Sequence, residues 1–217
     1  MNNFLILAHA RSGSTNLCNI FQSQGISMIC EPYNAHRGIE YLDYWGKNGF
    51  EESFDLILKE YEGVKHLYSF TTCDQTVYMK SKCKTVFLYR RNLLDAAVSL
   101  ELAFKTNVWL SSQKEDGYMS EKINLDVNLV QSAVNHLYRH KKNESSDCFI
   151  VAYEDIYMVS DGFDLVRCIF DFIGRKIIDE DVIKYNLDNS HKINDKKWSD
   201  LISNWSDICD NVVVPVW

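Results

Sequence analysis

Short apolar runs alternate with amphipathic segments along most of the chain. Short apolar runs predict β-strands at residues 3–8 and 26–30, and residues 64–69, 84–89 and 148–156 have the pattern of further strands. Apolar residues at helical spacing predict helices at residues 14–25, 51–63, 92–104, 129–140 and 163–174. Residues 105–121 have the polar character of a long loop. Strands that alternate with helices in this way favour an α/β fold, with a parallel β-sheet flanked by helices on both faces.

Length, composition and charge narrow the class of protein. The 217 residues, 46% of them apolar, can bury one large core, and we expect a single domain over residues 1–217. The formal net charge of −7 argues against non-specific binding to nucleic acid. No apolar run approaches the ~18–20 residues that cross a bilayer, and the N-terminus lacks a signal-peptide pattern. We therefore expect a cytoplasmic protein without a membrane span.

Seven cysteines are spread along the chain without a C-x-x-C pair. Their odd number argues against a full disulfide framework, and their spacing does not suggest a zinc site. We expect most of them to be reduced, buried thiols, and we expect no metal.

The segment "LAHARSGSTNL", residues 7–17, has the composition of an anion-binding turn between a strand and a helix. Free backbone N–H groups and the helix dipole make the start of such a helix attractive to anions. Ser12, Ser14 and Thr15 add hydroxyl donors. The Arg11 guanidinium adds a planar cation that suits phosphate oxygens. The alternative is that Ser14 or Thr15 only caps the helix.

Two better-known motifs do not fit this segment. A nucleotide-triphosphate P-loop requires G-x-x-x-x-G-K-[ST], but Ala8 stands at its first Gly and Ser14 at its Lys. Without that Lys the phosphate charge loses its main cation, which disfavours kinase or NTPase activity. The nucleophile elbow G-x-S-x-G is also absent, because Asn16 follows Thr15. The segment suits a bound anion better than a covalent nucleophile.

A second cationic segment follows the strand predicted at residues 84–89. Arg90 and Arg91 come directly after this strand, and Ser99 lies eight residues beyond Arg91 on the next helix. Ligands of parallel sheets bind beyond the carboxyl ends of the strands, so we expect both segments at one rim. Arg91 and the Ser99 hydroxyl would then meet the same anion. The alternative is a surface cation and an ordinary helix serine.

Together, "RSGSTNL" and "RRNLLDAAVS" resemble two motifs of the sulfotransferase superfamily, whose members use 3′-phosphoadenosine-5′-phosphosulfate as sulfuryl donor. "CEPYN" and "FIVAYEDI" also have counterparts in the family, and the resemblance covers residues 3–155 in order. It implies a single-domain, P-loop NTPase-like sulfotransferase fold. It also implies that the first motif binds the 5′-phosphosulfate through Arg11, Ser12, Gly13, Ser14, Thr15 and Asn16. The second motif is similar to the Arg-x7-Ser element that binds the 3′-phosphate, here Arg91 and Ser99.

Departures from the family pattern concern the cations. Arg11 stands where cytosolic animal members have Lys, and because Arg does not readily give up a proton, its role would be electrostatic. The C-terminal Arg-Lys-Gly…Trp element is not present as such. Lys192 and Trp198 have a similar spacing, which makes Lys192 a further candidate for donor binding. Lys65 is a candidate second cation, with a solvated strand end as the equal alternative.

Sulfuryl transfer also needs a general base for the acceptor. Relatives take this base from the loop after the first helix or from just beyond the lysine of the next strand, which here implies Glu31, His36 or His66. Pro32 fixes the backbone of Glu31 and turns its side chain out of the strand. Lys65 and His66 lie on opposite faces of their strand, so only one of the two can face the donor.

The resemblance therefore implies an enzyme that transfers a sulfuryl group to a hydroxyl or amine of a small organic, lipid or sugar acceptor. Aromatic residues at 33–50 and 105–120 would line the acceptor site or simply pack the loops: Tyr33, Tyr41, Tyr44, Trp45, Trp109 and Tyr118. The rival hypotheses are a P-loop-like kinase whose Lys comes from elsewhere and a non-catalytic anion-binding module. The sequence does not specify the acceptor or the oligomeric state.

Overall fold

The computed structural model describes residues 3–35, 39–109, 113, 121–142, 147–188 and 197–216. Contacts between Cα atoms group the chain into two compact units. The sheet unit comprises residues 1–91 and 144–190, and the helical unit comprises residues 92–143 and 191–217. The single domain over residues 1–217 stays a prediction.

The sheet unit is built on one parallel sheet. Among the described residues it contains five strands in the order β2-β3-β1-β4-β5. They are β1 (Phe4–Ala8), β2 (Met28–Cys30), β3 (Gly63–Leu67), β4 (Lys84–Tyr89) and β5 (Phe149–Ala152). Every neighbouring pair is parallel, which confirms the predicted α/β class. Because β1 lies between β3 and β4, the segments that follow these three strands emerge at one edge of the sheet.

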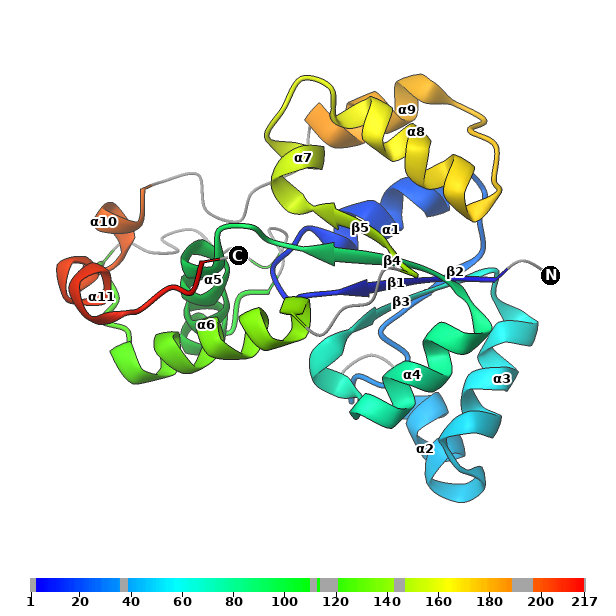
Figure 1. Ribbon diagram of the computed structural model, residues 1–217, viewed down its shortest axis with the longest axis horizontal. Helices are drawn as coiled ribbons and strands as arrows, with labels where there is room; N and C mark the ends of the chain where they lie inside the picture. The colour runs from blue at the N-terminus through cyan, green and yellow to red at the C-terminus, as the bar shows by residue number, and fades with distance from the viewer. Residues whose placement is uncertain are drawn as a thin grey trace. The chain divides into compact units, whose positions relative to one another are not determined.

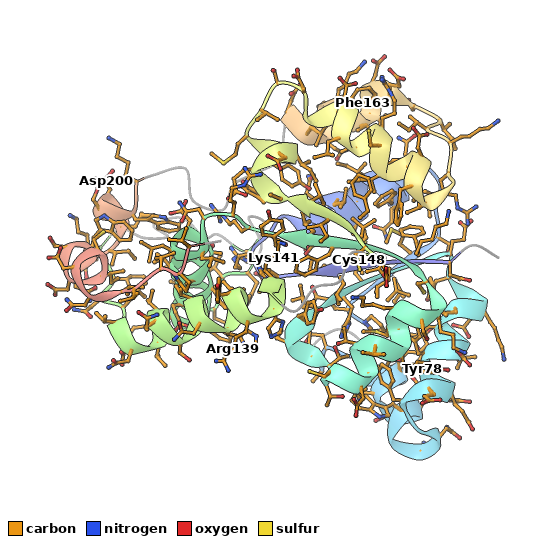
Figure 2. All side chains as sticks on the ribbon, in the orientation of Figure 1. Tyr78, Arg139, Lys141, Cys148, Phe163 and Asp200 are labelled. Carbon is orange, nitrogen blue, oxygen red and sulfur yellow. A yellow bond between two sulfur atoms is a disulfide. The ribbon has the colours of Figure 1, made fainter. Side chains whose placement is uncertain are left out.

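Helices cover both faces of this sheet, as Figure 1 shows. The α1 face carries α1 (Ser14–Ser23), α8 (Gly162–Ile173) and α9 (Glu180–Asp188). The α3 face carries α2 (Ile39–Asn48), α3 (Phe50–Glu60) and α4 (Cys73–Lys82). Side chains alternate along β1, so Ile6 joins the core of the α1 face and Leu7 the core of the α3 face. In Figure 2, Phe163 of α8 and Tyr78 of α4 mark the two sides.

The helical unit packs α5 (Leu93–Thr106) and α6 (Val127–Lys142) with two short helices, α10 (Trp198–Leu201) and α11 (Trp205–Asn211). Its apolar core draws on all four helices and includes Leu102, Val134, Leu201 and Ile208. Trp198 Nε1 donates to Asp95 Oδ1 at 2.8 Å, which ties α10 to α5. No described helix of either unit is both long and apolar enough to cross a membrane.

One predicted strand is partly wrong. The run at residues 148–156 is a strand only over β5, and "YEDIY" continues as the short helix α7 (Tyr153–Tyr157). Glu154 and Asp155 fall in the first turn of α7, where the positive end of the helix dipole favours carboxylates. The run at residues 26–30 is likewise a strand only from Met28 onward.

Helices α2, α4, α9, α10 and α11 have no counterpart among the predicted elements. Helix α4 does have a local signal, a capping box of Thr72 and Gln75. The Thr72 hydroxyl accepts the Gln75 N–H at 3.3 Å, and the Gln75 amide oxygen accepts the Thr72 N–H at 2.8 Å. The helix buries only Thr76 and Met79, so its apolar period is weak in the sequence.

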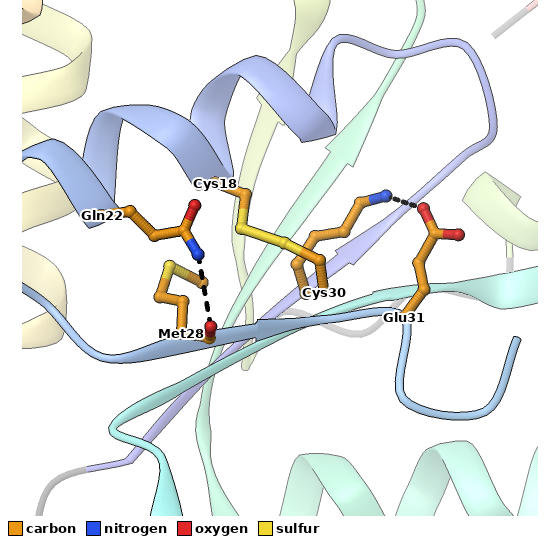
Figure 3. The surroundings of a disulfide bond; sticks show 6 residues. Cys18, Gln22, Met28, Cys30 and Glu31 are labelled. Atoms are coloured by element: carbon orange, nitrogen blue, oxygen red, sulfur yellow. Dashed lines mark hydrogen bonds and ion pairs between the residues drawn. A yellow bond between two sulfur atoms is a disulfide. The ribbon is translucent and has the colours of Figure 1, made fainter. Parts of the chain in front are cut away.

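Two cysteines are joined, which corrects the expectation of reduced thiols at these positions. Cys18 of α1 and Cys30 of β2 form a disulfide, shown in Figure 3. Their separation of 12 residues carries no motif, but β2 follows α1 directly and the crossover lays the helix over the strand. The expectation of buried thiols is also wrong for three free cysteines that are exposed: Cys73, Cys168 and Cys209.

Candidate anion-binding and catalytic site

The chain between β1 and α1 turns on two residues with left-handed backbone. Arg11 has a φ of 64° and Gly13 a φ of 78°, a region that residues other than glycine seldom enter. The Ser12 hydroxyl is buried and donates to the carbonyl of His9 at 2.7 Å, which closes the turn. We call residues 9–16 the anion loop.

The start of α1 carries no side-chain cap. Its N-cap is Gly13, which has no side chain that could accept from the first turn. Ser14 and Thr15 already lie inside the helix. The alternative in which Ser14 or Thr15 merely caps this helix is therefore wrong. The N–H groups of an uncapped first turn are donors for a bound anion, and Arg11 lies just before them.

Gly13 is required by a close approach of aromatic rings. A Cβ atom at this position would lie 2.6 Å from Tyr157 Cε2 and 3.0 Å from Tyr153 Cδ2, and the positive φ disfavours any other residue. The Tyr157 hydroxyl donates to the Gly13 carbonyl at 3.0 Å. The anion loop is thus held against α7 at this point.

Arg90 and Arg91 follow β4 and are both engaged by α7. The Arg91 N–H donates to Glu154 Oε2 at 2.9 Å. Arg91 Nη2 donates to the two carboxylate oxygens of Asp155 at 3.0 and 2.7 Å. The Arg90 guanidinium lies 4.8 Å from the centre of the Tyr153 ring, a cation–π contact. The Arg91 side chain is about half exposed, with 51% of its area accessible, so an anion can reach it.

The two cationic segments leave the same edge of the sheet. Ala8 of β1 pairs in register with Leu88 of β4, and the His9 N–H continues the ladder by donating to the Leu88 carbonyl at 2.9 Å. Arg11 lies two residues beyond His9, and Arg91 lies three residues beyond Leu88. The shared rim that the sequence predicted for them therefore exists in the sheet unit.

Lys65 and Glu31 form a buried ion pair at this edge. Lys65 of β3 lies in register with Cys30 of β2, and Lys65 Nζ contacts Glu31 Oε1 (Figure 3). Glu31 Oε2 accepts a hydrogen bond from Asn34 Nδ2 at 2.6 Å. The Glu31 N–H donates to the Lys65 carbonyl at 2.6 Å, and the Glu31 φ of 57° turns its side chain toward the lysine. The alternative of Lys65 as a solvated strand end is wrong.

His66 lies on the other face of the sheet. It is in register with Leu7, whose side chain belongs to the α3 face, and its ring centre is 5.6 Å from that of Tyr33. It is completely buried, and neither ring nitrogen has a hydrogen-bond partner among the described residues. Burial lowers the pKa of His66 to about 3, and the neighbouring Lys65 charge acts in the same direction. The sheet thus separates His66 from the Lys65–Glu31 pair.

We expect His66 to make the protein less stable in mild acid. Below its ordinary pKa of 6.5 the unfolded chain takes up a proton at His66 that the folded chain does not bind. The free energy of unfolding should fall by about 1.4 kcal/mol per pH unit, or about 2 kcal/mol between pH 7.5 and pH 5. In His66→Leu that component should vanish. Urea unfolding at the two pH values measures it, and parallel pH profiles of parent and variant would contradict the assignment.

The remaining candidates divide into four groups. Tyr44, Trp45 and Trp109 are partly exposed, and their place at an acceptor site stays a prediction. Tyr33 and Tyr41 are buried in the core of the α3 face, so they pack the fold rather than line an acceptor site. Ser99 is buried in α5 and belongs to the helical unit, and its role stays a prediction. Three candidates lie outside the described residues: His36, Tyr118 and Lys192.

Sequence reasoning did not single out the α7 residues that contact both cationic segments. Tyr153, Glu154, Asp155 and Tyr157 all belong to "YEDIY", whose first four residues were predicted as the end of a strand. The signal was the placement of two acidic residues directly after a strand, at the rim where Arg90 and Arg91 were expected.

Comparisons with known proteins find a likeness in fold and no matching sequence. No protein-family model matches the sequence, and no curated protein sequence matches it. Among solved structures, the chain is similar to mouse sulfotransferase SULT7A1, whose crystal structure is a complex with PAP. The alignment covers 100% of this chain and 76% of that chain, at 15% sequence identity and a TM-score of 0.50. A parallel sheet in this strand order, with helices on both faces and a full-length structural match, gives the chain the α/β fold of the sulfotransferases.

Proposed function

We propose that this chain is an enzyme that transfers a sulfuryl group from 3′-phosphoadenosine-5′-phosphosulfate to an acceptor. The observation that carries the proposal is the pair of cationic segments at one sheet edge, with Arg11 after β1 and Arg91 after β4. A doubly phosphorylated nucleotide needs two separate anion sites. The PAP bound to the structurally similar mouse sulfotransferase supports the same choice of ligand.

In this proposal the anion loop holds the 5′ end of the donor. The N–H groups of Ser14, Thr15 and Asn16 and the guanidinium of Arg11 surround the phosphosulfate. Arg91 binds the 3′-phosphate, while Ser99 and Lys192 stay candidates that rest on the sequence resemblance alone. Charge that develops on the departing phosphate is neutralised by donors already fixed in place.

Glu31 is the proposed general base. The acceptor oxygen or nitrogen forms a bond to sulfur while the bond from sulfur to the bridging phosphate oxygen breaks, and the acceptor proton passes to the Glu31 carboxylate. Lys65 orients this carboxylate through their ion pair, and Asn34 holds its second oxygen. His66 is the weaker candidate, because it lies on the α3 face and is fully buried.

The proposed acceptor is a small organic molecule, a lipid or a sugar with a free hydroxyl or amine. The acidic balance of the chain, −7 in formal charge, disfavours a densely anionic acceptor. The proposed location is the cytoplasm.

Binding of 3′,5′-adenosine diphosphate tests the donor site. Arg11→Ala and Arg91→Ala should each weaken its affinity about 10- to 100-fold, since each removes charge-assisted hydrogen bonds to a phosphate. Isothermal titration measures the affinity. Arg167→Ala is the matched control, because Arg167 is an exposed arginine of α8 that is paired with Asp164 and Glu180. If both site variants bind the nucleotide as tightly as the Arg167→Ala control, the proposed donor site is wrong.

A further inference from the structure

Helix α7 contacts both cationic segments with the side chains of four of its five residues. Tyr157 reaches the anion loop, and Tyr153, Glu154 and Asp155 reach Arg90 and Arg91. All of these residues belong to the sheet unit. The helix therefore connects the start of α1 with the end of β4.

The contact with the anion loop fixes one peptide group. The Gly13 carbonyl accepts the Tyr157 hydroxyl at 3.0 Å and also the Leu17 N–H of α1 at 3.1 Å. In a planar trans peptide the carbonyl and the following N–H point in opposite directions. Holding the Gly13 carbonyl toward α7 and α1 therefore aims the Ser14 N–H away from them. This N–H is the first donor of the helix, and its direction decides how well it meets an anion.

The Tyr157 hydroxyl acts as a permanent donor. Burial raises its pKa above the ordinary value of 10.0, and the nearby Tyr153 acts in the same direction. The hydroxyl therefore keeps its proton across the neutral range. The ring also leaves no room at Gly13, because a Cβ there would lie 2.6 Å from Tyr157 Cε2. Hydrogen bond and ring together prevent the peptide from turning.

The other end of α7 is anchored on β4. Glu154 accepts the Arg91 N–H at 2.9 Å, and Asp155 accepts from the Arg91 guanidinium at 3.0 and 2.7 Å. The Tyr153 ring lies under the Arg90 guanidinium and 5.0 Å from the Tyr157 ring. Tyr157 is thus supported through the helix by the same two arginines that follow β4.

We infer that Tyr157 is a positioning residue for the anion loop and acts through the Gly13–Ser14 peptide on an anion that it does not itself bind. The inference rests on the proposed function for the identity of that anion, the 5′-phosphate group of the donor nucleotide. Loss of this positioning role would weaken binding of the 5′-phosphate alone, whereas a general effect on folding would weaken binding of either phosphate.

The test compares three nucleotides on Tyr157→Phe, which removes only the hydroxyl. Isothermal titration is carried out with 3′,5′-adenosine diphosphate, adenosine 5′-phosphate and adenosine 3′-phosphate. Affinity for the two 5′-phosphorylated compounds should fall about five-fold, the size expected for one neutral hydrogen bond. Affinity for adenosine 3′-phosphate should stay unchanged.

Tyr41→Phe is the matched control. Tyr41 is a buried tyrosine on the α3 face, and its hydroxyl donates to Glu60 at 2.7 Å, so the variant loses a hydrogen bond remote from the anion loop. It should bind all three nucleotides as the parent does. Equal weakening of the 3′- and 5′-phosphates in Tyr157→Phe, or no weakening of either, overturns the positioning role while the donor site stands. A parent chain that binds none of the three nucleotides overturns the proposed function and the inference together.

Discussion

Replacing Lys65 by Met is expected to lower the free energy of unfolding by about 3–5 kcal/mol, because the buried Glu31 carboxylate then loses its cation. Both side chains of this pair are almost inaccessible, at 1% and 7% exposure. Met has nearly the length and volume of Lys, so the change removes charge with little change in packing. Urea unfolding near neutral pH measures the loss.

Two further variants separate charge from packing in this pair. In Lys65→Met combined with Glu31→Gln no charge stays buried, so much of the lost stability should return. Lys82→Met is the exposed control: Lys82 and Asp55 approach to 3.4 Å at 40% and 43% exposure, and such a pair contributes about 1 kcal/mol or less. A loss in Lys65→Met no larger than that in Lys82→Met would contradict the buried ion pair.

Reduction of the Cys18–Cys30 disulfide should lower the free energy of unfolding by about 2–3 kcal/mol. The bond closes a short loop, with 12 residues of separation, and joins the helix that starts at the anion loop to the strand that directly precedes Glu31. The unfolded chain gains freedom when the loop opens. Urea unfolding with and without tris(2-carboxyethyl)phosphine measures the difference.

Cysteine variants test whether the loss of stability on reduction comes from the Cys18–Cys30 disulfide. In Cys18→Ala combined with Cys30→Ala the reductant should have no effect on the unfolding midpoint. In Cys168→Ser, which changes an exposed free cysteine, the full effect should persist. A reductant effect that survives in the double variant would assign it to other cysteines.

The sheet was predictable because most of its strands are short, largely apolar runs between polar segments. β4 forms over Lys84–Tyr89 as predicted, and β1 and β3 differ from prediction by one or two residues at their ends. A parallel strand buried on both faces leaves few polar residues in its run, so its limits are visible in the sequence. The glycine at position 25, with a φ of 75°, follows the end of α1 as predicted.

The positions of the candidate site residues along the sheet were predictable, but the contacts between their side chains were not. The spacing of Arg11 and Arg91 after their strands was enough to place both at one rim. The pairing of Lys65 with Glu31 depends on the register between β2 and β3, which no local sequence pattern predicts. Helix α7 was hidden because Tyr153 to Ile156 follow directly on the apolar run of β5 and were predicted as its continuation, while the role of its side chains is decided by residues more than 60 positions away.

Left-handed backbone occurs at both Arg11 and Glu31, although neither is a glycine. At position 31 glycine would leave the buried Lys65 charge without its carboxylate, and that loss is larger than the strain it relieves. At position 11 relief of the strain is worth of order 1 kcal/mol, but glycine supplies no guanidinium. A selection for heat resistance alone would therefore favour replacement of Arg11, on which sulfuryl transfer is proposed to depend. Engineering of a more stable variant should leave residue 11 unchanged and seek its gains in other parts of the chain.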